Sequence, residues 1–224
     1  MKRYILFDLD GTLADSMVGV TKAIQQGLHS QGIEVADYRD LRALVGPPSQ
    51  EAYVHQYGMT AAQAKEAHRV QAAYYAQTGL FENEPYPGME TLLKNLRQAG
   101  RRLAVATSKP RVFAERIMEY FSWTDYFEVV MGSELDGRRQ KKAEVIEEVL
   151  HRLGNPPTEQ VVMIGDREYD VIGAHKLAMD CIGVLYGYGS REELERAGAE
   201  LIVQNIAALE RFLLGDDDQR RTDY

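Results

Sequence analysis

The sequence has the composition of an ordinary globular protein. Of its 224 residues, 45% are hydrophobic and 27% are charged, and the formal net charge is -8. This length suits one domain with an insert. The net negative charge repels polyanions, so a broad face for nucleic acid is not expected and any anion site must be local.

Cysteine content and hydropathy bear on where in the cell the protein is expected. Cys181 is the only cysteine, which excludes an internal disulfide and a cysteine zinc cluster and agrees with a reducing cytoplasm. The N-terminal apolar stretch Tyr4 to Phe7 is too short for a signal peptide, and no segment approaches the roughly 18 apolar residues of a membrane span. We therefore expect a cytoplasmic protein, as a monomer or homodimer, without a membrane partner.

The first predicted element is a buried strand from Tyr4 to Phe7, which runs into Asp8, Leu9, Asp10, Gly11 and Thr12. Residues two apart in an extended segment point the same way, so Asp8 and Asp10 can face one pocket, while Gly11 lets the backbone approach an anion. At ~4 Å and an effective dielectric of ~20, two carboxylates repel by about 4 kcal/mol, which favours a hard divalent cation. A polar turn is the alternative for this segment taken alone.

The next stretch, residues 16–83, predicts an all-helical insert. It is rich in Ala, Gln, Tyr and His at helical spacing, with Gly46-Pro47-Pro48 as an internal loop and residues 84–88 as a turn that ends it. The predicted domains are a sheet domain of residues 1–15 and 84–214, the insert, and a flexible tail of residues 215–224.

After the insert, three further apolar runs predict buried strands: Leu103 to Ala106, Val161 to Ile164, and Cys181 to Leu185. Between the second and third strands of the chain, the spacing of apolar residues predicts a helix over Ala143 to Leu153. Strands that alternate with helices indicate an α/β fold with a parallel sheet.

Polar residues stand where these strands and helices join. Thr107 and Ser108 precede a helix start, which favours either a phosphate site or an ordinary helix cap. Lys141 and Lys142 precede another helix, and one of these ammonium groups could neutralise a phosphoryl group, although a solvated lysine is the ordinary alternative. Further on, Asp166 follows a strand and Asp170 lies four residues later; taken alone, they would be a helix cap and a surface charge.

Together these segments resemble a known family. The ordered set Asp8-x-Asp10-Gly-Thr, Thr107, Lys142 and Gly165-Asp166-x-x-x-Asp170 is similar to the four signature motifs of the haloacid dehalogenase superfamily. The resemblance implies a Rossmann-like parallel sheet core with a small alpha-helical cap inserted after the first strand. Gly46-Pro47-Pro48 and residues 79–83 and 186–190 look like phosphoglycolate phosphatase-like and 5'-nucleotidase-like members.

The resemblance also implies roles for individual residues. Asp8 would be the nucleophile that is transiently phosphorylated, and Asp10 would be the general acid and base. Mg2+ would be held by Asp8, Asp166 and the Asp10 carbonyl, with Asp170 in the second shell or bound through water. The implied phosphate contacts are Gly11, Thr107, Ser108 and Lys142. Lys142 is favoured over Lys141 because its spacing to the helix matches the family better.

Several activities of the same fold compete. A dehalogenase would not need the second carboxylate, and a phosphonate hydrolase would need a cap lysine, for which Lys22 and Lys65 are the candidates. A sugar phosphomutase and a catalytically silent binding protein stay open. The expected substrate is a small phosphomonoester, with a nucleoside 5'-monophosphate or phosphoglycolate first. The cap residues that either line its pocket or pack as helix surface are Arg39, Arg42, Tyr53, His55, Tyr57, Tyr74 and Tyr75.

Overall fold

The computed structural model describes residues 2–45 and 49–215. The chain forms two compact units: a sheet unit of Met1–Ala14 and Pro85–Tyr224, and a helical unit of Asp15–Glu84. The short strands β2 (Ala14–Asp15) and β3 (Glu84–Pro85) pair where the chain passes from one unit to the other and back. The predicted loop Gly46-Pro47-Pro48 and the predicted tail beyond Gly215 lie outside the described residues.

The sheet unit contains a six-stranded sheet whose paired strands are parallel, which confirms the predicted fold class. In spatial order the strands are β5 (Val129–Ser133), β4 (Arg102–Pro110), β1 (Tyr4–Phe7), β6 (Val161–Gly165), β7 (Asp180–Val184) and β8 (Leu201–Val203). The four central strands are the predicted ones. The two edge strands, β5 and β8, were not predicted, because an edge strand is partly exposed and lacks a long apolar run.

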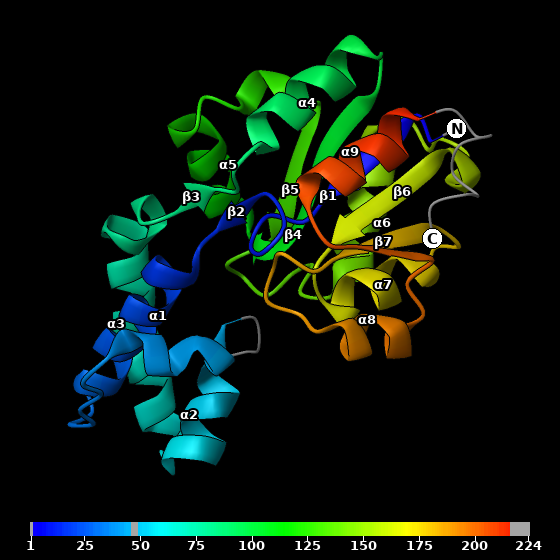
Figure 1. The fold of residues 1–224 in the computed structure, drawn as a ribbon. Coiled ribbons are helices and arrows are strands. Elements are labelled where there is room, and N and C mark those ends of the chain that lie inside the picture. The colour runs from blue at the N-terminus through cyan, green and yellow to red at the C-terminus, as the bar shows by residue number, and fades with distance from the viewer. Residues whose placement is uncertain (1, 46–48, 216–224) are drawn as a thin grey trace. The chain divides into compact units, whose positions relative to one another are not determined.

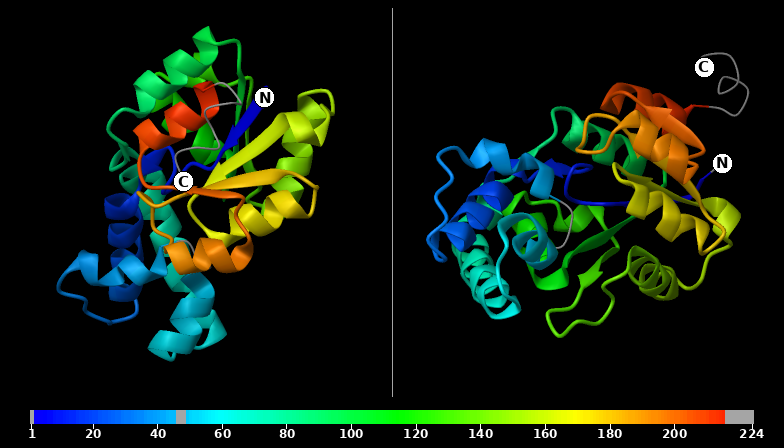
Figure 2. Two further views of the ribbon diagram at one scale, coloured as in Figure 1. Left: turned by 45° about the vertical axis from the view of Figure 1, so that its right-hand side comes forward. Right: turned by 90° about the horizontal axis from the view of Figure 1, so that it is seen from below.

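Helices cover both faces of this sheet (Figures 1 and 2). Helices α4 (Met89–Gln98) and α9 (Ile206–Leu214) pack together on one face, and α5 (Arg111–Tyr120) packs on β4 and β5. The other face carries α6 (Lys142–Arg152), α7 (Glu168–His175) and α8 (Arg191–Ala197). A core beneath them joins Leu6, Met163 and Cys181 of the sheet to Val149 of α6.

The strand register decides where the polar strand ends meet. Phe7 of β1 lies beside Val105 of β4 and Ile164 of β6. The ends of β1 and β6 therefore lie level with Val105, and β4 continues past that level to Pro110. Because open parallel sheets bind ligands at this edge, the polar residues that follow Phe7, Val105 and Ile164 along the chain are candidates for a site.

The helical unit is built from α1 (Met17–His29), α2 (Ser49–Tyr57) and α3 (Ala61–Gln77), with short 3-10 helices η1 (Tyr38–Leu44) and η2 (Gly79–Phe81). Its hydrophobic cluster includes Leu28 and Tyr53. The Tyr53 ring is buried and its hydroxyl donates to Gln71 Oε1 at 2.8 Å, so Tyr53 packs as a structural residue. Tyr75 is also buried, whereas Arg42 and His55 are exposed.

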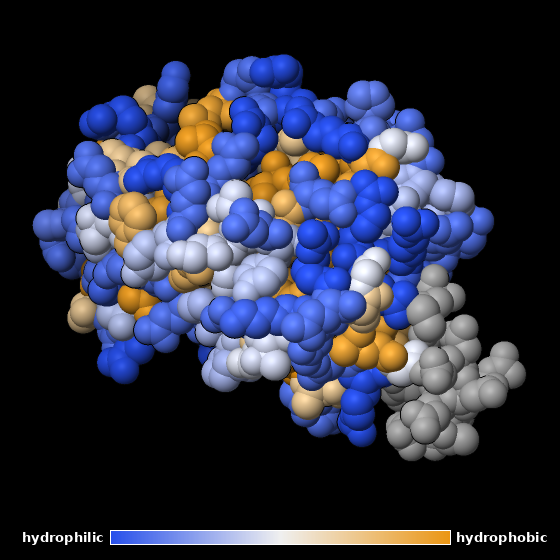
Figure 3. All heavy atoms as spheres, turned by 90° about the horizontal axis from the view of Figure 1, so that it is seen from above, coloured by the Kyte–Doolittle hydropathy of each residue, from blue (hydrophilic) through white to orange (hydrophobic). Residues whose placement is uncertain are grey.

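In the part of the chain that is described, no helix is both long and apolar enough to cross a membrane. The face drawn in Figure 3 is covered mainly by hydrophilic side chains, with hydrophobic ones in small groups. Small apolar groups of this kind are normal on a protein surface.

Candidate active site

Three carboxylates meet at the carboxyl edge of the sheet. Asp8 follows β1, Asp166 follows β6, and Asp170 lies in the first turn of α7. Each offers an oxygen within 4.8 Å of the others, and all three side chains are buried. We call Asp8, Asp166 and Asp170 the acidic cluster. Asp8 is more than 150 positions from Asp166 and Asp170 in the sequence, and the parallel pairing of β1 with β6 brings them together.

Lys142 is the cation of this cluster. Its Nζ lies 2.9 Å from Asp8 Oδ1 and 2.7 Å from Asp170 Oδ1, and it donates to the Ala106 carbonyl at 3.0 Å. The Lys142 side chain is only 3% exposed. Its neighbour Lys141, at the N-cap position of α6, is exposed, because residues adjacent at a helix start point about 100° apart.

Burial dominates the protonation of the cluster. It raises the pKa of Asp166 to about 8, and the charges of Asp170 and Asp8 add to this rise. Burial also raises the pKa of Asp170 to about 6, although the Lys142 ammonium opposes the rise. Burial disfavours the charged form of Lys142, but Asp170 and Asp8 outweigh this and raise its pKa above the usual value. The positive charge of Lys142 therefore does not neutralise the negative charge that the three carboxylates of the acidic cluster would carry.

The acidic cluster fits a hard divalent cation. Asp8 Oδ1 and Asp170 Oδ1 are buried and contact the Lys142 ammonium at 2.9 and 2.7 Å, and each carboxylate oxygen has a further lone pair that a cation can use. Asp166 is held by the Thr12 hydroxyl, which donates to Oδ1 at 3.3 Å, and by the Tyr188 N–H, which donates to Oδ2 at 2.8 Å. Asp166 and Asp170 are buried carboxylates whose pKa values are raised, and from such groups Mg2+ displaces protons.

Asp10 and Gly11 lie in the turn after β1. The Asp10 carboxylate is not in the acidic cluster, and its Oδ2 instead lies 2.8 Å from Lys109 Nζ. The expectation for Asp10 concerns its carbonyl, which the cluster geometry does not test. Gly11 has φ +80°, and a Cβ there would overlap the Asp166 carboxylate. Glycine therefore allows this turn to approach Asp166 closely.

Thr107 and Ser108 lie within β4, which is longer than predicted and extends to Pro110. Thr107 is buried, and its Oγ1 accepts a hydrogen bond from the Lys109 N–H at 3.2 Å. The Ser108 side chain is exposed, and its carbonyl accepts from the Ser133 hydroxyl at 2.8 Å. Phosphate binding by the Ser108 hydroxyl stays a prediction, because these contacts do not involve that hydroxyl.

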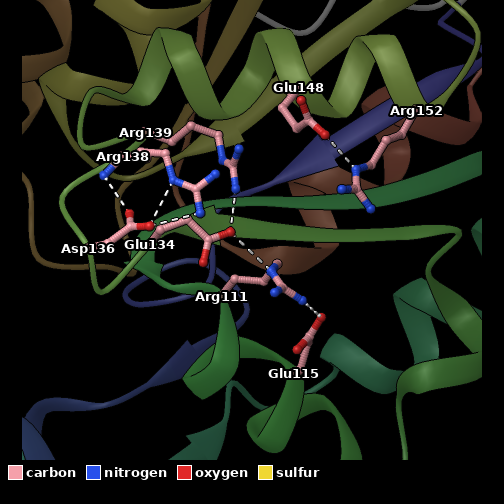
Figure 4. A network of polar contacts seen from close by, with 8 residues as sticks. All are labelled: Arg111, Glu115, Glu134, Asp136, Arg138, Arg139, Glu148 and Arg152. Carbon is pink, nitrogen blue, oxygen red and sulfur yellow. Dashed lines mark hydrogen bonds and ion pairs between the residues drawn. The ribbon is translucent and has the colours of Figure 1, made fainter.

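A network of charged residues ties down the loop that leads from β5 to α6 (Figure 4). Glu134 pairs with Arg139 and accepts from Arg111 of α5 at 3.3 Å. Within the loop, Asp136 Oδ2 pairs with Arg138 at 2.8 Å and its Oδ1 accepts from the Arg138 N–H at 3.1 Å. The loop is thus attached to α5, which fixes the start of α6, where the Lys142 side chain enters the site.

Sequence reasoning did not assign a site role to Thr12, Lys109 or Tyr188. Thr12 belongs to the recognised Asp-x-Asp-Gly-Thr motif, so its contact with Asp166 had a signal in the sequence. Tyr188 contributes a backbone N–H, which no side-chain pattern reveals. Lys109 carried no signal, because a lysine is exposed by default and its burial depends on the course of β4.

Comparison with known proteins agrees with this site. The family model of the haloacid dehalogenase-like hydrolases matches residues 5–184. A 5'-nucleotidase of Pseudomonas aeruginosa is 41% identical over 93% of this chain and 94% of its own length. The tyrosine-protein kinase PtkA of Mycobacterium tuberculosis is 37% identical over 88% of this chain and 67% of its own length. The structure of a putative phosphatase from Clostridium difficile has a TM-score of 0.90 at 45% identity and covers 95% of this chain and 99% of that one.

The matched family region contains Asp8, Thr107, Lys142 and Asp166, all at the carboxyl edge of the sheet or bound to groups there. The fold, the order of the motifs and the likeness in sequence agree. The chain belongs to the haloacid dehalogenase-like hydrolases.

Proposed function

We propose that the protein is a Mg2+-dependent phosphomonoesterase that acts on a small phosphorylated metabolite. The observation that carries this proposal is the acidic cluster with Lys142 between Asp8 and Asp170, at the carboxyl end of the first strand. Family membership supports it further. A site that gathers both anionic ligands and a buried cation suits the transfer of an anionic group.

The residues divide the work of two half-reactions. Asp8 attacks phosphorus and forms an aspartyl-phosphate while the bond to the leaving oxygen breaks, and Asp10 gives that oxygen a proton. Asp10 then takes a proton from the water that attacks the aspartyl-phosphate and releases Asp8. The Lys142 ammonium stabilises negative charge on the phosphoryl group, and the buried Thr107 hydroxyl is proposed as its hydrogen-bond donor.

Mg2+ would be held by Asp8 and Asp166 together with the Asp10 carbonyl, and Asp170 would support it from the second shell or through water. The ion would supply the positive charge that lets an anionic nucleophile approach an anionic phosphoryl group.

The substrate is proposed to be a nucleoside 5'-monophosphate, with phosphoglycolate as the second choice. Likeness to a 5'-nucleotidase over almost the whole of both chains supports the first. Tyr74 and Arg39 remain candidates for recognition in the helical unit, although Arg39 is already paired with Asp37 at 2.6 Å.

Phosphonate hydrolysis is disfavoured by the helical unit itself. A lysine that forms a Schiff base needs a lowered pKa. The hydrogen bond to Glu82, at 2.5 Å, raises the pKa of Lys22 instead. Lys65 is exposed on α3, as an ordinary solvated lysine is.

A second candidate function is transfer of the phosphoryl group to a hydroxyl acceptor rather than to water. The likeness to PtkA favours it, since that relative is named a tyrosine kinase. A sugar phosphomutase would also use a hydroxyl acceptor. In this chain, either activity would begin with attack by Asp8 and would differ from hydrolysis in the acceptor that takes the phosphoryl group.

The test is a screen of phosphometabolites with Mg2+ and with chelator. We expect Mg2+-dependent release of phosphate, highest for a nucleoside monophosphate, and loss of on the order of 10⁴-fold or more in Asp8→Asn. Asp180→Asn is the matched control, because Asp180 begins β7 at the opposite edge of the sheet. Parallel reactions with ATP and a tyrosine peptide, or with a sugar phosphate, detect transfer to a hydroxyl. Equal activity in Asp8→Asn, or none in the wild type with any substrate, would contradict the proposal.

A further inference from the structure

The two oxygens of the Asp10 carboxylate have different surroundings. Oδ2 lies 2.8 Å from Lys109 Nζ. Oδ1 is buried and has no hydrogen-bond partner among the described residues. A buried acceptor without a partner is costly, so its persistence in a site marks an oxygen that is available to another group.

Lys109 owes its position to an irregularity in β4. Ala106 lies beside Met131 of β5, yet Pro110 lies beside Ser133, so four steps along β4 match two along β5. Such extra residues in one strand redirect side chains, and they occur often beside active sites. The result is a lysine side chain that is only 5% exposed.

Two features of β5 stabilise this course of the backbone. The Ser133 hydroxyl donates to the Ser108 carbonyl at 2.8 Å. Gly132 has no side chain, and a Cβ there would overlap the Lys109 carbonyl. Ser133 and Gly132 therefore both accommodate the irregular segment of β4. Lys109 is held in place by its backbone as well as by the ion pair of its ammonium group.

We propose that Lys109 is a positioning residue for Asp10, and this rests on the proposed phosphatase function. The ammonium holds Oδ2, so that Oδ1 is the oxygen that exchanges protons. In the first half-reaction the proton on Oδ1 goes to the leaving oxygen as its bond to phosphorus breaks and the bond from Asp8 forms. In the second, Oδ1 takes a proton from water as the water oxygen bonds to phosphorus and the bond to Asp8 breaks.

This role differs from two others that a buried lysine in a phosphatase can have. A lysine that binds the substrate phosphate affects every substrate alike, through KM. A lysine that only stabilises the fold affects thermal stability and leaves the order of substrates unchanged. A lysine that positions the general acid acts most strongly on substrates whose leaving oxygen needs a proton.

The experiment compares Lys109→Met with wild type on an alkyl phosphate and on p-nitrophenyl phosphate, whose leaving group needs little protonation. General acid catalysis contributes about 10² to 10⁴-fold. We expect kcat/KM for the alkyl phosphate to fall by about 10 to 10²-fold more than for p-nitrophenyl phosphate. Lys109→Arg should restore part of this difference. In the Asp10→Asn background, Lys109→Met should add little, because the two residues act as a unit.

The matched control is Lys2→Met. Lys2 pairs with Asp180 at 2.6 Å at the amino edge of the same sheet, so its loss removes the same charge from an ion pair remote from the site. We expect Lys2→Met to keep the substrate ratio of the wild type. Thermal melting of each variant identifies any that fail to fold, and Lys109→Gln replaces Lys109→Met in that case.

An equal fall for both substrates with a raised KM, additive with Asp10→Asn, would assign Lys109 to phosphate binding and overturn the inference. An unchanged ratio in Lys109→Met would overturn it too, while the phosphatase proposal would stand. Absence of Mg2+-dependent hydrolysis in the wild type would overturn both.

Discussion

Gly11 is the residue that brings the turn after β1 against Asp166. Its φ is +80°, and the Cβ of any other residue at this position would overlap the Asp166 carboxylate. Two separate constraints therefore act at one position. The first is backbone conformation, and the second is the space beside the acidic cluster.

The two constraints can be separated by mutation. Gly100 has a similar φ of +74°, but a Cβ there would meet nothing within 4 Å. Gly11→Ala and Gly100→Ala should each lose about 1 to 2 kcal/mol of stability from the left-handed backbone. Only Gly11→Ala should also lose the rise in melting temperature that Mg2+ produces, as measured by thermal melts over a Mg2+ titration. Equal responses to Mg2+ in the two variants would contradict this reading of the site.

Lys142 supports a second prediction at this scale. Removing one partner of a buried ion pair leaves an uncompensated charge and costs about 3 to 5 kcal/mol. We expect Lys142→Met to lose this much in chelator, by denaturant unfolding, and to recover part of it with Mg2+, since a cation can replace the ammonium. Lys141→Met, at the exposed neighbouring position, should change stability by less than about 0.5 kcal/mol. If Lys142→Met is as stable as wild type in chelator, the ammonium is not needed to compensate the buried charge of Asp8 and Asp170, and the prediction is wrong.

Among the elements, the strand pair β4 and β5 positions several residues of the site. β4 carries Thr107 and Lys109 in its irregular part, and β5 matches that part through Gly132 and Ser133. The loop after β5 is tied to α5 through Glu134, which determines where α6 begins. One strand pair at the edge of the sheet thus places two lysines on the site from different directions.

Gly132→Ala tests the strand pair. The added Cβ would meet the Lys109 backbone, which cannot move aside as a side chain can, and overpacking of this kind costs about 1 to 3 kcal/mol. We expect a fall in phosphatase kcat/KM that is again larger for alkyl than for aryl phosphates. Gly183→Ala is the control, because its Cβ would meet the flexible end of the Leu194 side chain at 2.7 Å. Loss of activity in Gly183→Ala without loss in Gly132→Ala would contradict the proposal that β5 positions Lys109 through Gly132.

For the whole molecule, the acidic cluster links stability to pH and to metal. The pKa values of Asp166 and Asp170 rise from 3.8 to about 8 and about 6. A raised carboxyl pKa means that the folded state holds its proton more tightly than the unfolded state. The stabilisation is complete below pH 3.8, and it is lost as pH rises through about 6 and about 8.

The metal-free protein should therefore lose this part of its stability between those limits, while the stabilisation by Mg2+ grows, because the ion competes with protons for the same oxygens. Thermal melts at pH values across that window, with Mg2+ and with chelator, measure both trends. Asp166→Asn should flatten both curves. A Mg2+ effect that does not vary with pH would place the ion elsewhere.

Much of the fold could be predicted from local pattern. The strands at Tyr4–Phe7 and Val161–Gly165 are continuous apolar runs, and the carboxylates that follow them stand at strand ends in a recognisable order. Continuous burial on both faces and alternation with helices are properties of short segments, so the sequence by itself determined the α/β class and the family resemblance.

Only the tertiary structure decided how Asp8, Asp166, Asp170 and Lys142 share one space, and that Lys109 is buried against Asp10. These contacts depend on the register between strands that are distant in the sequence and on an irregularity of β4 that has no local signature. Burial of a lysine is a property of everything packed around it. A sequence pattern reports which way a side chain tends to point, whereas the packing of the whole sheet determines what that side chain meets.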